Sequence, residues 1–148
     1  IRLLLEPSAA ASACRNATVE GLGRMKQAVS DAERAHRKAD VLAYMQANFA
    51  FRTAWVDMLD NRQLAQIIER LRDHAQAVRL ATLREKEFRA LSLQHTKEIL
   101  EAFLRKDVEA VRERIAHNLR ESAASYYAKQ ETLVRSNAPE TRAPRKRA

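Results

Sequence analysis

The chain has 148 residues, with 27 Lys and Arg residues against 19 Asp and Glu residues, so it carries a formal net charge of +8. It contains two glycines and three prolines, while 46% of its residues are hydrophobic. Sheets, barrels and glycine-rich nucleotide-binding folds need turn residues that are scarce here, so the composition predicts one all-α domain with a hydrophobic core.

Two further observations limit the setting in which we expect the protein to work. The chain has one cysteine, Cys14, which excludes an internal disulfide and a Cys-based zinc site and favours a cytoplasmic location. No apolar run approaches the roughly 18 residues that a membrane span needs, so no membrane segment is expected.

The apolar residues recur at helical spacing along six segments, at residues 2–15, 18–37, 40–59, 61–83, 86–105 and 107–132. Residues typical of helix N-caps stand at or just before the start of four of these segments: Asn16 and Thr18, Asp40, Asp60 and Asn61, and Asp107. The connections are short, and Lys106 stands before Asp107 in a turn expected to form without glycine. Short connections make neighbouring helices antiparallel, so the pattern predicts an antiparallel helical bundle.

The end of the chain differs in composition from the rest. It contains Pro139 and Pro144, no apolar cluster, and a run of basic residues at its terminus. We therefore expect a helical domain over residues 1–132 and a disordered basic tail over residues 133–148. A basic tail can bind nucleic acid or an anionic surface, but a solvated terminus without a partner is the simpler interpretation.

Polar residues interrupt the apolar face of the third segment and border that of the fourth. Asn48 falls within the stripe of the third segment, and Arg52, one turn later, lies at its edge. A buried arginine is costly unless an anion pairs with it. Arg52 could instead extend to water or pair with a nearby Asp, and both alternatives stay open. Arg79 lies at the edge of the fourth stripe.

Two histidines occupy different faces of the fifth and sixth segments. His95 lies inside the apolar stripe of the fifth segment, where a lone histidine is more often a packing residue than a ligand. His117 lies opposite the main stripe of the sixth segment, so periodicity favours an exposed side chain. The sequence has no P-loop, nucleophile elbow, paired-cysteine motif or His-Glu-x-x-His, and we expect no enzymatic activity.

Several short segments match the motifs of one family in order and spacing. The start, Arg2-Leu3-Leu4-Leu5-Glu6, is similar to an Arg-x-x-Leu-Glu motif. Residues 48–52 stand where the family usually has Asp-x-x-Phe-His, and residues 60–64 are similar to Gly-Asn-x-x-Leu. Residues 95–103, then Asp107 and His117, are similar to a third pattern that ends in a histidine. The sequence therefore resembles the FCD domain, the effector-binding domain of the FadR-like branch of GntR transcription regulators.

This resemblance implies an antiparallel bundle of six to seven helices. In many members an Asp and three His in the bundle core bind a divalent metal, which holds a small carboxylate effector. By position, Asn48 stands for the Asp, Arg52 for the first His, and His95 and His117 for the other two. The resemblance also implies that His117 points inward, against the periodicity.

The substitutions change the chemistry that this set can support. Arg52 stays protonated and cannot bind a metal, and Asn48 is a weak neutral ligand. We therefore favour no cofactor, and a zinc or nickel ion would have only His95, His117 and Asn48 as ligands. Our hypothesis is that Arg52 itself binds the effector carboxylate, that Asn48, His95 and His117 orient the ligand, and that Arg79 is a second cation.

The functional expectation is a ligand-sensing and dimerisation domain of a bacterial GntR-family regulator. Its expected partners are a small carboxylate effector and a second copy of the chain. The winged helix-turn-helix that precedes this domain in the family is expected to be absent, so operator DNA would be bound only through that missing domain. The alternative is a helical dimerisation or scaffold module without a ligand.

Overall fold

The computed structural model describes the backbone of residues 1–136, and their side chains except those of residues 73–78 and 133–136. The described residues form six helices, in the order α1 (Arg2–Arg15), α2 (Val19–Arg37), α3 (Val41–Val56), α4 (Arg62–Leu83), α5 (Lys86–Leu104) and α6 (Val108–Ser136). The prediction of an all-α bundle is confirmed. Helix α6 continues past the expected end at residue 132, and the rest of the expected tail, residues 137–148, lies outside the described residues.

One of the expected N-cap residues caps each of the four corresponding helices, whereas Asn16 and Asp60 hydrogen bond to each other instead. The side-chain oxygens of Thr18, Asp40, Asn61 and Asp107 each accept a hydrogen bond from a backbone N–H in the first helical turn, at 2.9–3.0 Å. The turn before Asp107 does impose a conformation that favours glycine, because Lys106 has φ 54°. The chain thus makes this turn without glycine but with local backbone strain.

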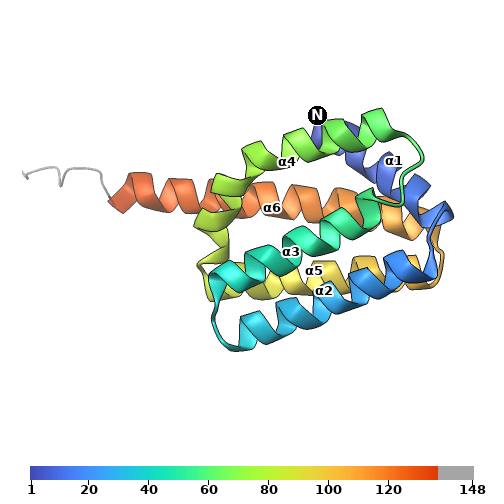
Figure 1. Cartoon of the computed structure of the whole chain (residues 1–148). Helices are drawn as coiled ribbons and strands as arrows, with labels where there is room; N and C mark the ends of the chain where they lie inside the picture. The colour runs from blue at the N-terminus through green and yellow to red at the C-terminus, as the bar shows by residue number, and fades with distance from the viewer. Residues whose placement is uncertain (137–148) are drawn as a thin grey trace, which may run out of the picture.

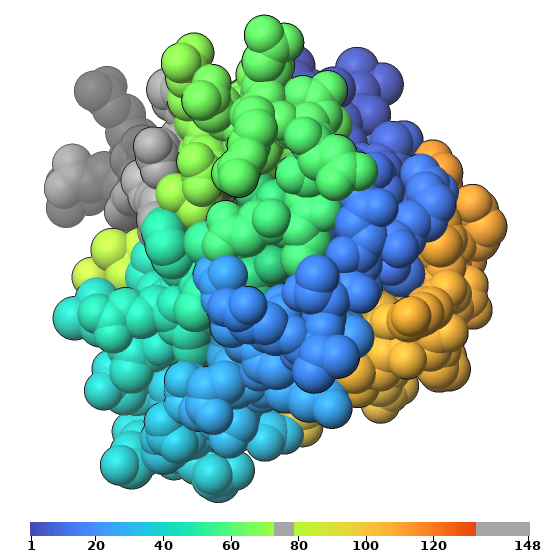
Figure 2. Space-filling model, turned by 45° about the vertical axis from the view of Figure 1, so that its right-hand side comes forward, coloured from blue at the N-terminus to red at the C-terminus, as the bar shows by residue number. Residues whose placement is uncertain are grey.

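The helices pack into a bundle in which α2 lies along α3 and α1 lies along α6, the two most extensive pairings (Figure 1). Figure 2 shows α2, in blue, and α3, in cyan to green, side by side over one face of the molecule, with the start of α6 at the edge. Buried alanines of α1 allow its close approach to α6: Ala9, Ala10 and Ala13. Within the described residues, no helix is both long enough and apolar enough to cross a membrane.

The core consists of two apolar clusters with a polar layer between them. The larger cluster includes Trp55, Phe103 and Ile115 and receives residues from all six helices. The smaller cluster lies at the other end of the bundle and contains Tyr44 and Leu93. Along α3 and α5 the polar residues singled out by the sequence fall between residues of the two clusters, so the fold gathers them in one layer.

Candidate functional site

A buried carboxylate from α1 lies at the centre of the polar layer. The side chain of Glu6 is 1% exposed and forms an ion pair with Arg52 of α3, whose side chain is 12% exposed. Arg2, one turn before Glu6, also binds it, with Nε 2.5 Å from Oε1. Two arginines therefore share one buried anion.

The environment of Arg52 explains its electrostatics. Burial lowers the pKa of the Arg52 guanidinium to about 10, and the adjacent Glu6 carboxylate opposes this decrease. The guanidinium also lies 5.8 Å from the centroid of the Trp55 ring, within reach of a cation–π contact. The sequence left open whether Arg52 extends to water or pairs locally, and the structure gives it a buried partner from another helix.

A small cavity borders this ion pair and Arg79. It has a volume of about 20 Å³ and is lined by polar side chains that include Asn48, Thr96 and Asn118. The Asn48 amide donates a hydrogen bond to the hydroxyl of Ser92 on α5, at 3.3 Å. A space of this size holds about one water molecule, so an organic acid does not fit among Asn48, Arg52 and Glu6 in this arrangement.

Arg79 of α4 is half-buried and separates the small cavity from a much larger one. No carboxylate in the described part of the chain forms an ion pair with it. The pKa of the Arg79 guanidinium is lowered by burial and, to a smaller extent, by the positive charge of Arg2. Arg79 is therefore a partly desolvated cation that forms no ion pair with a carboxylate in that part of the chain, although the charge of Glu6 acts on it from a longer distance and opposes the decrease.

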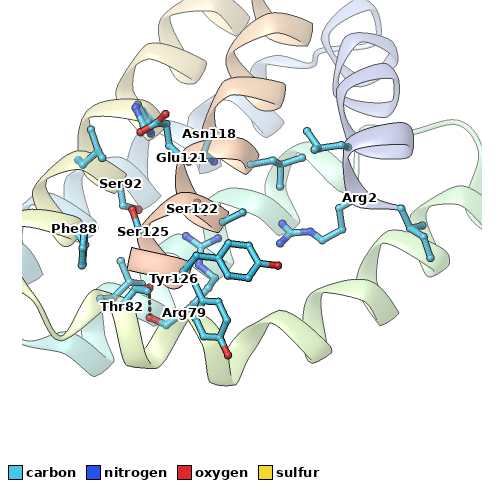
Figure 3. Close-up of a pocket in the computed structure, with 18 residues that line it drawn as sticks. Arg2, Arg79, Thr82, Phe88, Ser92, Asn118, Glu121, Ser122, Ser125 and Tyr126 are labelled. Carbon is cyan, nitrogen blue, oxygen red and sulfur yellow. Dashed lines mark hydrogen bonds between the residues drawn. The ribbon is translucent and has the colours of Figure 1, made fainter. Parts of the chain in front are cut away.

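The large cavity has a volume of about 440 Å³ and lies between α1, α4, α5 and the second half of α6. Figure 3 shows Arg2 and Arg79 extending into it from α1 and α4, with Tyr126 of α6 beside them. Hydroxyl groups line other parts of its wall, among them Ser92 and Ser122. This volume lies within the range of roughly 300–1,000 Å³ that is typical of ligand pockets.

The two histidines of the expected site lie together but in different environments. The His95 side chain is 6% exposed and lines the large cavity. Its ring centroid is 4.9 Å from that of His117, with the rings edge to face. Burial lowers the pKa of His95, and the neighbouring His117 lowers it further. The imidazole of His95 is therefore favoured in its neutral form, able to donate one hydrogen bond and accept another.

The inward orientation that the resemblance implied for His117 is wrong, because this side chain is exposed. Helix α6 buries Val111, Ile115 and Leu119, which recur every fourth residue along one face. His117 is two residues from both Ile115 and Leu119, about 200° around the helix, and so it lies at the rim of the bundle. The periodicity argument, which favoured exposure, is confirmed.

The donor set does not suit the divalent metal that many family members bind. Arg52 is a paired cation, His117 lies at the rim, and Asn48 already hydrogen bonds to Ser92. Among the side chains that the structure describes, no group of three His, Cys, Asp or Glu residues is arranged to hold a metal ion. A site of this kind usually needs three protein ligands.

Sequence reasoning missed the residue that organises the polar layer. Glu6 was noticed only as the end of a motif, although Arg2 and Glu6 are spaced by four residues and so predict an ion pair on one helix face. Ser122 and Tyr126 were not among the predicted site residues, and they line the large cavity. Both residues follow Leu119 on α6 and carry hydroxyl groups, and this change from apolar to polar side chains along the helix could have indicated a cavity there.

The chain matches the model of the FCD family, described as "FCD domain", over residues 1–121. The chain belongs to the FCD family. Among solved structures, this FCD domain is similar to E. coli McbR/YncC, a GntR-family regulator, with 24% sequence identity and a TM-score of 0.78. The match covers 86% of this chain and 65% of McbR/YncC, and at this identity the similarity shows the fold. No curated protein matches the sequence.

Membership in the family has a functional consequence at the level of the domain. FCD domains of GntR-family regulators bind small-molecule effectors and dimerise, and the family is not enzymatic. The chain is therefore a regulatory effector-binding domain.

Proposed function

We propose that this FCD domain binds a small organic acid in the large cavity and that Arg79 supplies the positive charge that pairs with the acid. The observation that carries the proposal is the contrast between two arginines of the same polar layer. Glu6 neutralises Arg52, whereas Arg79 borders a cavity of ligand size without an ion-pair partner in the described residues. A desolvated guanidinium binds a carboxylate through two parallel hydrogen bonds.

The other expected site residues take different roles in this proposal. His95 lines the cavity and offers a neutral imidazole to the ligand. Asn48 and Arg52 lie behind Arg79, around the small cavity, and hold the polar layer in place rather than contact the ligand. This arrangement replaces the hypothesis that Arg52 is the anchor, because binding a ligand there would require Arg52 to leave Glu6.

The proposal includes the assembly in which the domain works. Two copies associate as a homodimer in a transcription regulator, and a DNA-binding domain elsewhere in that protein contacts the operator. The acid changes DNA binding by binding one arrangement of the bundle more tightly than another. Light scattering on the purified chain should give twice the mass of one chain, and a monomer at all concentrations would contradict this part.

The test uses the chain with a panel of aliphatic, aromatic and hydroxy acids in thermal-shift and calorimetric titrations. An acid at about 100 times its dissociation constant adds about 2.7 kcal/mol to the free energy of unfolding. For a chain of this size, this corresponds to a rise in melting temperature of roughly 5–11 °C. Arg79→Met should weaken binding by roughly 10-fold or more, because a charge-assisted hydrogen-bonded pair is lost.

Two matched variants control for the loss of a positive charge. Arg120→Met removes an exposed arginine of α6 and should leave the affinity unchanged. Arg52→Met removes the arginine paired with Glu6. It should lower the free energy of unfolding and have a smaller effect on the free energy of binding the acid. The anchor role of Arg79 is refuted if Arg79→Met binds the acid as well as Arg120→Met does.

One observation favours the alternative of a scaffold without a ligand. Glu6 satisfies Arg2 and Arg52 within the bundle, so the buried charges there need no external anion. A scaffold would show no thermal shift with any acid on the panel while remaining dimeric.

A further inference from the structure

We propose that the acid is a monocarboxylate with an extended apolar body, a medium-chain aliphatic or an aromatic acid. Its carboxylate lies at Arg79 and its body lies along the wall formed by Leu83, Phe88, Leu91 and Leu119. This inference rests on the proposed function and adds the chemical class of the ligand. Three properties of the large cavity support it: its volume, its wall and its charge.

The volume excludes a good fit for the smallest acids. The large cavity measures about 440 Å³, against about 20 Å³ for the space around Asn48 and Arg52. An acid of two to four carbon atoms at Arg79 would leave most of the large cavity to water. A longer ligand that displaces this water from the apolar wall should bind more tightly than a short acid, because affinity increases with the apolar area that is buried.

The wall is divided into a cationic part and an apolar part. Arg2 and Arg79 reach into the cavity from α1 and α4 (Figure 3). Leu83 at the end of α4 and Phe88 and Leu91 at the start of α5 provide apolar surface on the same cavity. Hydroxyl groups also line the cavity and can orient a ligand, but they supply no second positive charge: Thr82, Ser92, Ser122, Ser125, Tyr126 and Tyr127. This division matches a molecule with one charged end and one apolar end.

The charges favour one carboxylate over two. Arg2 already binds Glu6, so Arg79 is the lining cation that lacks an anion in the described part of the chain. The lining also contains an acidic residue, Glu121, which lies apart from both arginines in Figure 3 and pairs with neither of them in the structure as described. A second carboxylate would therefore lie against Phe88 and Leu91 or approach Glu121, and both placements are unfavourable.

The experiment measures affinity for straight-chain monocarboxylates from butanoate to decanoate by calorimetry on the full 148-residue chain. Each added methylene should tighten binding by about fourfold until the cavity is filled. The corresponding primary amides should bind much more weakly, because they lack the charge that pairs with Arg79. Dicarboxylates of the same length should also bind more weakly than the monocarboxylates.

A pair of variants on α6 tests where the apolar body of the ligand lies. Ser122→Phe puts a ring into the cavity. It should remove the increase in affinity with each added methylene, while the short acids still bind. Ala124→Phe adds the same ring on the exposed side of α6 and should leave the whole series unchanged. Circular dichroism spectra of the two variants check that both are folded.

The outcomes separate this inference from the proposed function. The inference would be overturned if short dicarboxylates or hydroxy acids bind through Arg79 and the affinity does not increase with chain length from butanoate to decanoate. The proposed function would then still stand. An equal gain per methylene in Ser122→Phe would also overturn it, because the body would then lie elsewhere. If no acid of any shape binds, the proposed function itself is wrong.

Discussion

The buried ion pair between Glu6 and Arg52 leads to the sharpest prediction about stability. Glu6→Gln keeps the size of the side chain and removes the charge that Arg52 and Arg2 share. Because Glu6 is 1% exposed and Arg52 is 12% exposed, bulk water does not solvate the freed guanidinium, and the adjacent cavity has room for only about one water molecule. Removing one partner of such a pair costs about 3–5 kcal/mol.

For a domain of this size, that loss should lower the melting temperature by roughly 6–20 °C. The assay is thermal and urea unfolding followed by circular dichroism, with Glu98→Gln as the matched control. Glu98 pairs with Arg114, whose side chain is 50% exposed, so breaking that pair should cost about 1 kcal/mol or less.

The double variant Glu6→Gln/Arg52→Met tests the cause of the loss. It leaves no unpaired charge at position 52, and replacing a buried ion pair by uncharged side chains is often neutral. Stability should therefore recover by a large part of the original loss. A cost of Glu6→Gln no larger than that of Glu98→Gln, or no recovery in the double variant, would refute the reasoning.

Three further predictions concern turns, caps and pH. Lys106→Gly should increase the free energy of unfolding by up to about 1 kcal/mol, because Lys106 has φ 54°; a decrease in the urea midpoint would contradict this. Asp107→Ala should decrease it by about 1 kcal/mol, because the cap that accepts the Ala110 N–H is lost, and an unchanged midpoint would count against the cap. The pKa of His95 is lowered in the folded state, so the unfolded state binds more protons as the pH falls below the ordinary value of 6.5, and stability should decrease there. Urea midpoints at pH of about 7.5 and about 5.5 should show this decrease, and His95→Gln should reduce it; an equal decrease in His95→Gln would exclude His95 as a source.

The helices were predictable because their signals are local. A cap such as Asp40 or Asn61 acts within one turn, and the apolar period of each segment reports which face is buried. These signals need no knowledge of which helices are neighbours. The expected element order and fold class therefore agree with the structure, and the ends of the helices differ by a few residues.

The site was predictable only in part because it depends on how helices pair. The sequence placed Arg52 at the edge of a stripe but could not show that α1 brings Glu6 against it. In the same way, periodicity identified Arg79 as a residue at the edge of a stripe, while the large cavity exists only because α6 extends beside α4 and α5. For His117, the local signal for exposure was correct and the inward orientation implied by the family was not.

The structural cluster and the proposed ligand site share one side chain, Arg2. This arginine binds Glu6 and also lines the large cavity, so a carboxylate at Arg79 lies where it competes with Glu6 for Arg2. In Glu6→Gln the competitor is neutral, and Arg2 can turn fully to the ligand. The variant should therefore be less stable but bind the acid more tightly, and the acid should restore more of its melting temperature than it adds to the unmodified chain. Loss of stability alone would follow from any damage to the core, whereas shared use of Arg2 predicts lower stability together with higher affinity. The higher affinity should disappear in Glu6→Gln/Arg2→Met and persist in Glu6→Gln/Arg52→Met; the opposite pattern would assign the effect to Arg52.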